Sequence, residues 1–206
     1  FPLSKLSRDG PPDHRSATRV NLNANHFRKR KRREANMPVY NRITEFEDDM
    51  RAWRHEIHRH PELCFEEVKT AAIVADKLKE WGIETHEGIA KTGVVGVIKG
   101  QGSSTRSIGI RADMDALPMQ EVGSPSYKSV EDGKMHACGH DGHTAILLGA
   151  AKYLAETRNF DGTVNVIFQP AEEGGAGGDL MVKEGLFDRF ECDAVYGLHN
   201  LPNFPK

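Results

Sequence analysis

Short β-branched segments alternate with segments of helical periodicity along residues 37–206, and this alternation restricts the fold more than any other feature of the sequence. The predicted helices cover residues 43–57, 68–81, 143–154 and 179–184, and the predicted strands cover residues 93–99, 107–113, 163–169 and 193–198. The first helix should end before Pro61, and Gly82 is a plausible C-terminal cap for the second. Strands that alternate with helices in this way predict an α/β sheet with helices on its faces.

The first 36 residues differ from the rest of the chain in composition. They hold ten Lys and Arg residues against three acidic ones, and they include the basic run 28–33. They show no apolar periodicity, so we expect residues 1–36 to be a disordered basic extension. Met37 resembles a natural start of the folded part. The basic run is compatible with a nuclear-localisation or nucleic-acid-binding patch, but a solvated charge run is the simpler interpretation because no aromatic residues are interleaved with it.

Composition excludes several classes of protein. With 206 residues, of which 38% are hydrophobic, the chain has enough apolar side chains for one core. No segment approaches the roughly 18 apolar residues of a membrane span, and the N-terminus lacks the apolar core of a signal peptide. The three cysteines are too few and too widely spaced for a disulfide framework. We therefore expect a cytoplasmic protein without a membrane partner.

Candidate metal ligands are concentrated in the segment His136-Ala-Cys-Gly-His-Asp-Gly-His143. A Cys and a His two residues apart on a turn with glycine can direct a thiolate and an imidazole to one point. The carboxylate pair Glu172-Glu173 follows one predicted strand, and His199 follows another. Ligand sites of α/β sheets gather at the carboxyl ends of strands, so these groups should converge on zinc or a similar divalent ion.

Other polar residues have simpler explanations. By itself, a Glu-Glu pair before glycines is common in exposed acidic loops. His55, His58 and His60 are expected to cap and pack a helix rather than to bind metal. His136 and His143 flank the Cys-Gly-His motif and are candidates for contacts with the substrate or with neighbouring loops. Cys64 and Cys192 are expected to be small buried residues.

Five motifs in collinear order resemble a known family, and the resemblance covers about residues 37–206. The motifs are RHEIHRHPEL at 54–63, RADMDALP at 111–118, MHACGHDGHT at 135–144, FQPAEEG at 168–174 and GLHN at 197–200. They resemble the metal-dependent amidohydrolases that include hippurate hydrolase, N-acyl-amino-acid amidohydrolase and indole-acetyl-amino-acid hydrolase, in the aminoacylase and carboxypeptidase clan. The resemblance implies a zinc-peptidase-like catalytic domain with a mixed sheet and helices on both faces. It also implies hydrolysis of the amide bond of a small N-acyl amino acid, either hippurate-like or N-acetylated.

The resemblance also assigns roles to individual residues. It implies two divalent ions, among Zn, Mn, Co and Ni, and the metal ligands that it implies are Cys138, His140, Glu173 and His199. Glu172 would act as the general base, beside the metals but not bound to them. In the wider clan a His-x-Asp motif ends the strand that here ends in Asp113-Met-Asp115. We interpret Asp115 as a residue that orients a ligand imidazole, the alternative being an ordinary turn residue at the strand end.

The resemblance further implies a longer protein. Family members continue with a lid domain and then with a second catalytic part that supplies one more His ligand, and they are expected to form homo-oligomers. Residues 37–206 would then be the N-terminal portion of the catalytic domain, incomplete at its C-terminus, and we expect impaired hydrolysis by this chain. Two alternatives are compatible with the sequence: a non-catalytic metal-binding fragment, and a protein that binds nucleic acid through its basic tail. We do not expect a nucleic-acid partner.

Overall fold

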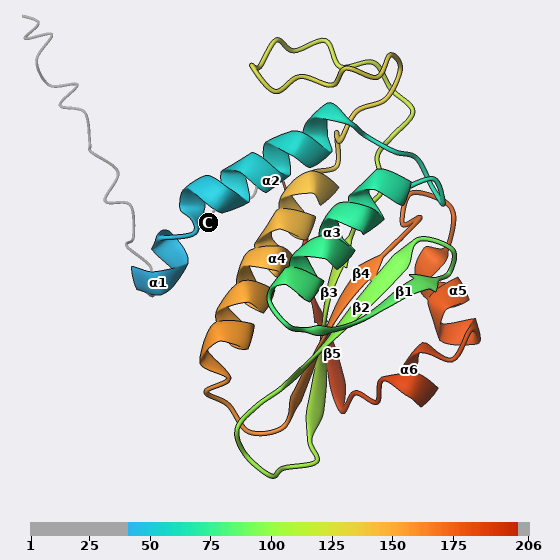
Figure 1. The fold of residues 1–206 in the computed structure, drawn as a ribbon. Coiled ribbons are helices and arrows are strands. Elements are labelled where there is room, and N and C mark those ends of the chain that lie inside the picture. Colours follow the sequence, from blue (N-terminus) through green and yellow to red (C-terminus); the bar gives the residue numbers. More distant parts are fainter. Residues whose placement is uncertain (1–40, 202–206) are drawn as a thin grey trace, which may run out of the picture. The chain divides into compact units, whose positions relative to one another are not determined.

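The computed structural model describes residues 41–201, which fold as the predicted α/β structure (Figure 1). The elements in chain order are α1 (Asn41–Thr44), α2 (Glu47–Arg59), α3 (Val68–Glu80), β1 (Glu84–Ile89), β2 (Gly93–Lys99), β3 (Ser107–Asp113), α4 (His140–Thr157), β4 (Thr163–Gln169), α5 (Gly177–Lys183), α6 (Leu186–Arg189) and β5 (Ala194–Gly197). The expected basic extension, residues 1–36, lies outside the described residues. Within residues 41–201, no helix has both the length and the hydropathy needed to cross a membrane.

The five strands form one mixed sheet in the order β1-β2-β4-β3-β5. β2 pairs antiparallel with both β1 and β4, whereas β3 pairs parallel with both β4 and β5. Because three neighbouring strands are parallel, the carboxyl ends of β4, β3 and β5 lie at the same edge of the sheet. Loops can converge there without interrupting the core, which makes this edge the natural place for a site.

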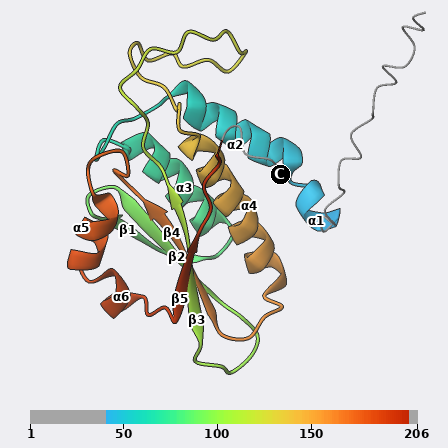
Figure 2. The same ribbon diagram turned by 180° about the vertical axis from the view of Figure 1, so that it is seen from behind.

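Helices cover both faces of the sheet, as predicted. Side chains of α3 and α4 pack on one face in a core that includes Leu78, Leu148 and Phe168. α5 and α6 pack on the other face, where Met181 and Leu186 contact the strands; Figure 2 shows these two helices in the view from behind. Phe168 and its neighbour Ile167 on β4 belong to different cores, as expected for a strand that is buried on both faces.

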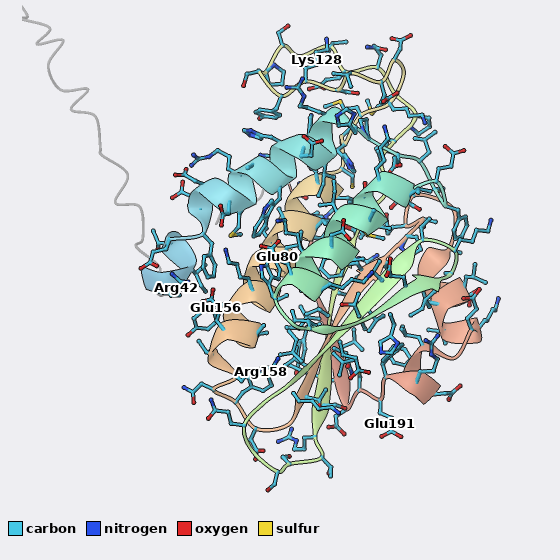
Figure 3. All side chains as sticks on the ribbon, viewed as in Figure 1. Arg42, Glu80, Lys128, Glu156, Arg158 and Glu191 are labelled. Carbon is cyan, nitrogen blue, oxygen red and sulfur yellow. The ribbon has the colours of Figure 1, made fainter. Side chains whose placement is uncertain are left out.

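The helix ends follow the sequence signals with two exceptions. The α3 terminus at Gly82 is as expected, since the Gly82 amide binds the Lys79 carbonyl at 3.0 Å and the Ile83 amide binds the Leu78 carbonyl at 3.0 Å, the pair of bonds typical of a Schellman cap. The predicted helix 43–57 is interrupted before Glu47, so α1 is a separate turn. An Arg42–Glu156 ion pair joins α1 to α4 (Figure 3). α4 begins at His140, three residues earlier than predicted.

One strand was not predicted at all. β1 is an edge strand with the sequence ETHEGI, and most of its side chains are exposed or half-buried. Only its pairing with β2 makes it a strand, and a bulge near Gly88 interrupts that pairing. Sequence periodicity fails here because an edge strand that carries charged side chains shows no alternation of apolar and polar residues. The short helix α6 was also not predicted.

A buried polar cluster joins α2 to the N-terminal end of α4. His58 Nδ1 lies 2.8 Å from Asp141 Oδ2, and His58 Nε2 lies 3.3 Å from Glu121 Oε1. Arg54 Nε donates to the same Asp141 oxygen at 3.0 Å. The hydrogen bond with Asp141 raises the pKa of His58 above its ordinary value, and Glu121 adds to this effect although burial opposes it. His58 therefore packs between two carboxylate side chains that favour its protonated form.

The first prediction concerns the pH dependence of stability. Because the pKa of His58 is raised on folding, its contribution is fully present below about pH 6.5, the unfolded value, and is lost as pH rises through the folded pKa. The melting temperature should fall between pH 6.5 and pH 8.5, and His58→Gln should flatten this part of the profile. A change of about 1 kcal/mol shifts Tm by roughly 2–4 °C in a chain of this size.

The control for this measurement is His86→Gln, because His86 lies on the edge strand β1, far from the cluster in sequence. This variant should keep the wild-type slope. A His58→Gln profile parallel to that of the wild-type protein would show that the His58 cluster does not set the pH dependence.

Candidate metal centre

The parallel half of the sheet brings four chain segments to one edge. Asp113 ends β3 and pairs with Gln169, which ends β4. The acidic pair Glu172-Glu173 follows β4, and His199 lies two residues beyond the end of β5. The fourth segment is the start of α4, where Gly139 is the N-cap residue, has a φ of 92° and turns the chain between Cys138 and the first helical residue, His140. Such a positive φ favours glycine.

The four predicted metal ligands lie together at this edge. The ligand atoms of Cys138, His140 and Glu173 are all within 4.8 Å of one another. His199 Nε2 lies 3.3 Å from Cys138 Sγ. A thiolate, two imidazoles and a carboxylate form a donor set that suits zinc or a similar divalent ion. The chemistry of these residues therefore fits a bound metal.

The imidazole of His140 gives the clearest sign of a cation site. His140 is fully buried, and its Nδ1 binds the Asp115 backbone carbonyl at 2.8 Å. This bond places the proton on Nδ1 in a neutral ring, so Nε2 carries a lone pair. Nε2 is buried without a hydrogen-bond partner and lies 3.6 to 3.8 Å from oxygens of three carboxylates, those of Asp113, Glu172 and Glu173. An Nε2 atom that faces only carboxylate oxygens requires positive charge between them, either a proton on the ring or a bound cation.

The negative charges around the cluster also favour a bound cation. Burial raises the pKa of the Cys138 thiol to about 12, and the carboxylates of Glu173 and Glu172 contribute to the increase. Burial lowers the pKa of His140, but Asp115 and Asp113 outweigh it and raise the pKa above its ordinary value. Both shifts favour retention of a proton at a site rich in negative charge. A divalent cation would supply that positive charge and would favour the thiolate.

Asp115 contacts both His140, at the start of α4, and the acidic pair Glu172-Glu173. Its Oδ1 lies 3.3 Å from His140 Nδ1 and accepts the Glu172 amide at 3.0 Å. Its Oδ2 accepts the Glu173 amide at 2.9 Å. Burial would raise the pKa of Asp115, but the hydrogen bonds from His140 and from the two amides lower it, so the side chain is a carboxylate. The structure thus places Asp115 in contact with the imidazole of His140, a predicted ligand.

Glu172 lies beside the ligand cluster and is more exposed than Glu173. Its side chain is 38% exposed, against 23% for Glu173. Glu172 Oε2 is 3.8 Å from His140 Nε2, but Glu172 does not belong to the group formed by Cys138, His140 and Glu173. Two adjacent carboxylates therefore have different environments, one within the cluster and one at its solvent side. This arrangement is compatible with one ligand and one neighbouring general base.

A second group adds Asp113 and His143 to two of the predicted ligands, His140 and His199. The ligand atoms of Asp113, His140, His143 and His199 also lie within 4.8 Å of one another. His143 Nδ1 is 2.7 Å from Asp113 Oδ1, and His143 Nε2 accepts the Asn200 amide at 3.1 Å. Since both of its ring nitrogens already have partners, His143 is better suited to holding the 199–200 segment than to binding metal. This contact agrees with the expectation that His143 would contact a neighbouring loop. The sequence assigned no role to Asp113.

Comparison with known proteins agrees with this geometry. Residues 109–206 match the sequence model of peptidase family M20/M25/M40. The chain is 55% identical to the hippurate hydrolase of Campylobacter jejuni over 160 residues, which are 78% of this chain and 41% of that protein. It is 43% identical to the N-acetyl-L-cysteine deacetylase of Bacillus subtilis over 172 residues, 83% of this chain and 40% of that protein. The predicted family resemblance is confirmed.

A solved structure extends the likeness to the fold. The YXEP protein of Bacillus subtilis, described as a dinuclear metal-binding peptidase of the M20 family, has a TM-score of 0.74 and 42% sequence identity. The match covers 79% of this chain and 45% of the YXEP chain. The chain spans about two fifths of the length of the curated relatives that it matches. The fold is therefore shared with a metal-binding M20 protein over most of the chain.

The second prediction tests the ligand assignment. Cys138→Ser and His140→Ala should each lower the divalent metal retained after dialysis, since each removes a donor from the cluster. Zinc content per chain, measured by mass spectrometry of the metal, is the readout, and it should fall further as pH is lowered because protons compete for the donors. Cys192→Ser and His86→Ala are the matched controls and should keep the parent's content. Equal metal in all five proteins would contradict the assignment.

Proposed function

We propose that this protein is a metal-dependent amidohydrolase that hydrolyses N-acyl amino acids, hippurate-like or N-acetylated, to a carboxylic acid and a free amino acid. The observation that carries the proposal is the convergence of Cys138, His140, Glu173 and His199, with the carboxylate of Glu172 beside them. The relatives support the substrate class, because their names include hippurate hydrolase, N-acetyl-L-cysteine deacetylase and IAA-amino acid hydrolase. A small N-acyl amino acid is the partner that we propose.

In this proposal the four converging residues hold two divalent ions, drawn from Zn, Mn, Co and Ni. When bound, such ions lower the pKa of a water molecule and polarise the amide carbonyl. Asp115 orients the His140 imidazole through Nδ1, which leaves Nε2 free to coordinate. Glu172 Oε2 accepts a proton from the attacking water and delivers it to the nitrogen of the departing amino acid. The side chain of Glu172 is accessible to water because 38% of its surface is exposed.

The free cysteines bear on where this protein works. Cys64, Cys138 and Cys192 all lie in the part of the chain that the structure describes, and none forms a disulfide. A thiol ligand such as Cys138 needs a reducing environment to stay available for metal. We therefore propose a cytoplasmic enzyme.

The third prediction separates the base from the ligand. Glu172→Gln should reduce kcat by roughly 10²–10⁴-fold with metal content unchanged, because a general base is lost. Glu173→Gln should lose metal as well as activity. The assay follows amino acid release from N-benzoylglycine and N-acetyl amino acids by the full-length protein. Both substitutions remove one negative charge from adjacent positions, so only the metal content distinguishes them.

A third variant controls for the loss of charge. Glu191→Gln removes a carboxylate from an exposed position outside the cluster (Figure 3) and should leave both rate and metal content unchanged. Turnover of either substrate by Glu172→Gln at the wild-type rate would rule out the proposed base. Metal binding without turnover in the wild-type full-length protein would instead favour the alternative of a non-catalytic metal-binding protein.

A further inference from the structure

The turn that carries Glu172 and Glu173 is held through its backbone. Three consecutive amides of this turn donate to buried carboxylates from distant parts of the chain. The Ala171 amide donates to Glu67 Oε1 at 2.8 Å, and the next two amides donate to the two oxygens of Asp115. Asp115 was a predicted site residue, whereas Glu67 lies just before α3, more than one hundred positions away in the sequence.

Glu67 is fully buried, and both of its oxygens have partners. Oε1 accepts the Phe65 amide at 3.0 Å in addition to that of Ala171, and Oε2 accepts the Thr92 hydroxyl. Phe65 and Ala171 have φ values of 62° and 51°, in the left-handed region that residues other than glycine rarely adopt. One carboxylate oxygen therefore binds the amides of two strained residues. Strained backbone persists where its surroundings fix it, and it is concentrated at functional sites.

The segment that contains Glu67 contacts the site in two further places. Cys64 Sγ donates to the Glu173 carbonyl at 3.2 Å, and the Glu62 carbonyl accepts the Ala116 amide at 2.8 Å. The turn is also tightly packed on its other side, because a Cβ atom at Gly177 would lie 1.8 Å from the Pro170 carbonyl oxygen. Residues 62–67 thus connect both strand ends, and the turn has little room to shift without breaking these contacts.

We propose that Glu67 is a positioning residue of the candidate site, one that fixes the direction in which the Glu172 and Glu173 side chains leave the turn. It does not contact substrate or metal; it acts through the Ala171 amide. Two adjacent side chains separate into a base and a ligand only when the backbone between them has one conformation. A displacement of about 1 Å at a reacting group can cost about 10²-fold in rate. The kinetic part of this inference depends on the proposed function, but the backbone part does not.

The test compares three substitutions. Glu67→Met keeps the approximate shape of the side chain but accepts no hydrogen bond, so the Ala171 amide loses its partner. Glu67→Gln should rescue the contact, since its amide oxygen can accept both backbone amides and its NH₂ group can donate to the Thr92 hydroxyl oxygen. Thr92→Val removes the neighbouring buried hydrogen bond and leaves Glu67 Oε1 in place, so it controls for a general loss of stability.

The main readout is amide hydrogen exchange of the metal-free 206-residue protein. In Glu67→Met, exchange at residues 171–173 should rise about tenfold or more relative to residues 164–168 of β4, whereas Glu67→Gln and Thr92→Val should keep the wild-type ratio. The second readout is Co²⁺ affinity, with the thiolate absorption band of Cys138 as the signal. It should weaken by about 10–100-fold in Glu67→Met, the usual effect of losing a residue that supports a ligand. In the full-length protein kcat should fall more than KM rises.

The exchange rates at residues 171–173 decide whether the proposal holds. Wild-type exchange at residues 171–173 in Glu67→Met overturns the proposal, whatever the activity of the protein. An equal rise in Thr92→Val also overturns it, because the effect would then come from lost stability. Faster exchange with weaker Co²⁺ binding supports it, even if the full-length protein hydrolyses no N-acyl amino acid and the proposed function fails. If Glu67→Met does not fold, Glu67→Asp withdraws the carboxylate by one methylene and is measured in the same way, with the same criterion.

Discussion

The Asp115 carboxylate is the contact on which the rest of the candidate site depends. It binds the amides of Glu172 and Glu173 and faces the Nδ1 atom of His140, so one side chain sets both the acidic turn and the ring of a ligand. Three hydrogen-bond donors keep it ionised despite its burial. A buried carboxylate with this many donors is costly to replace, because each donor would lose its partner in a site shielded from water. The residue two positions beyond the end of β3 thus fixes the positions of the acidic turn and of the His140 ring.

Asp115 and the neighbouring carboxylates concentrate negative charge in the site. This charge favours the binding of a cation. Asp113, Glu172 and Glu173 lie close to an imidazole lone pair and to a thiol whose pKa is raised to about 12. Without a positive charge, the fold must tolerate this repulsion. A ligand that binds only the folded state stabilises it by about 2.7 kcal/mol at a concentration one hundred times its Kd. Metal binding should therefore contribute to folding as well as to chemistry at this edge of the sheet.

The sequence predicted the fold best where the structure is most buried. The predicted strands 93–99, 107–113 and 163–169 coincide with β2, β3 and β4, because inner strands of a covered sheet are rich in β-branched apolar residues. Edge strand β1 was missed because its side chains are exposed and charged. For the site, the strand-end positions predicted that the Cys-Gly-His segment, the acidic pair and His199 would converge, and the family resemblance implied which four residues are ligands. It gave no indication of Glu67, since nothing local distinguishes this buried glutamate from the exposed Glu66 beside it; only the tertiary contacts to Ala171 and Thr92 do.

The loop between β3 and α4, which carries Cys138, is also held by tertiary contacts that the sequence does not reveal. The only strand pairing that the structure shows within this loop is the bridge between Leu117 and Met135. Side-chain contacts with α2 hold the rest of the loop. Tyr127 stacks on His55 with ring centroids 3.9 Å apart, and Glu121 binds both His58 and the Ser129 amide. α2 therefore serves as the support for this loop. It also holds the start of α4 through Asp141, the residue that follows ligand His140. An irregular loop can carry a metal ligand because a rigid helix fixes it at several points along its length.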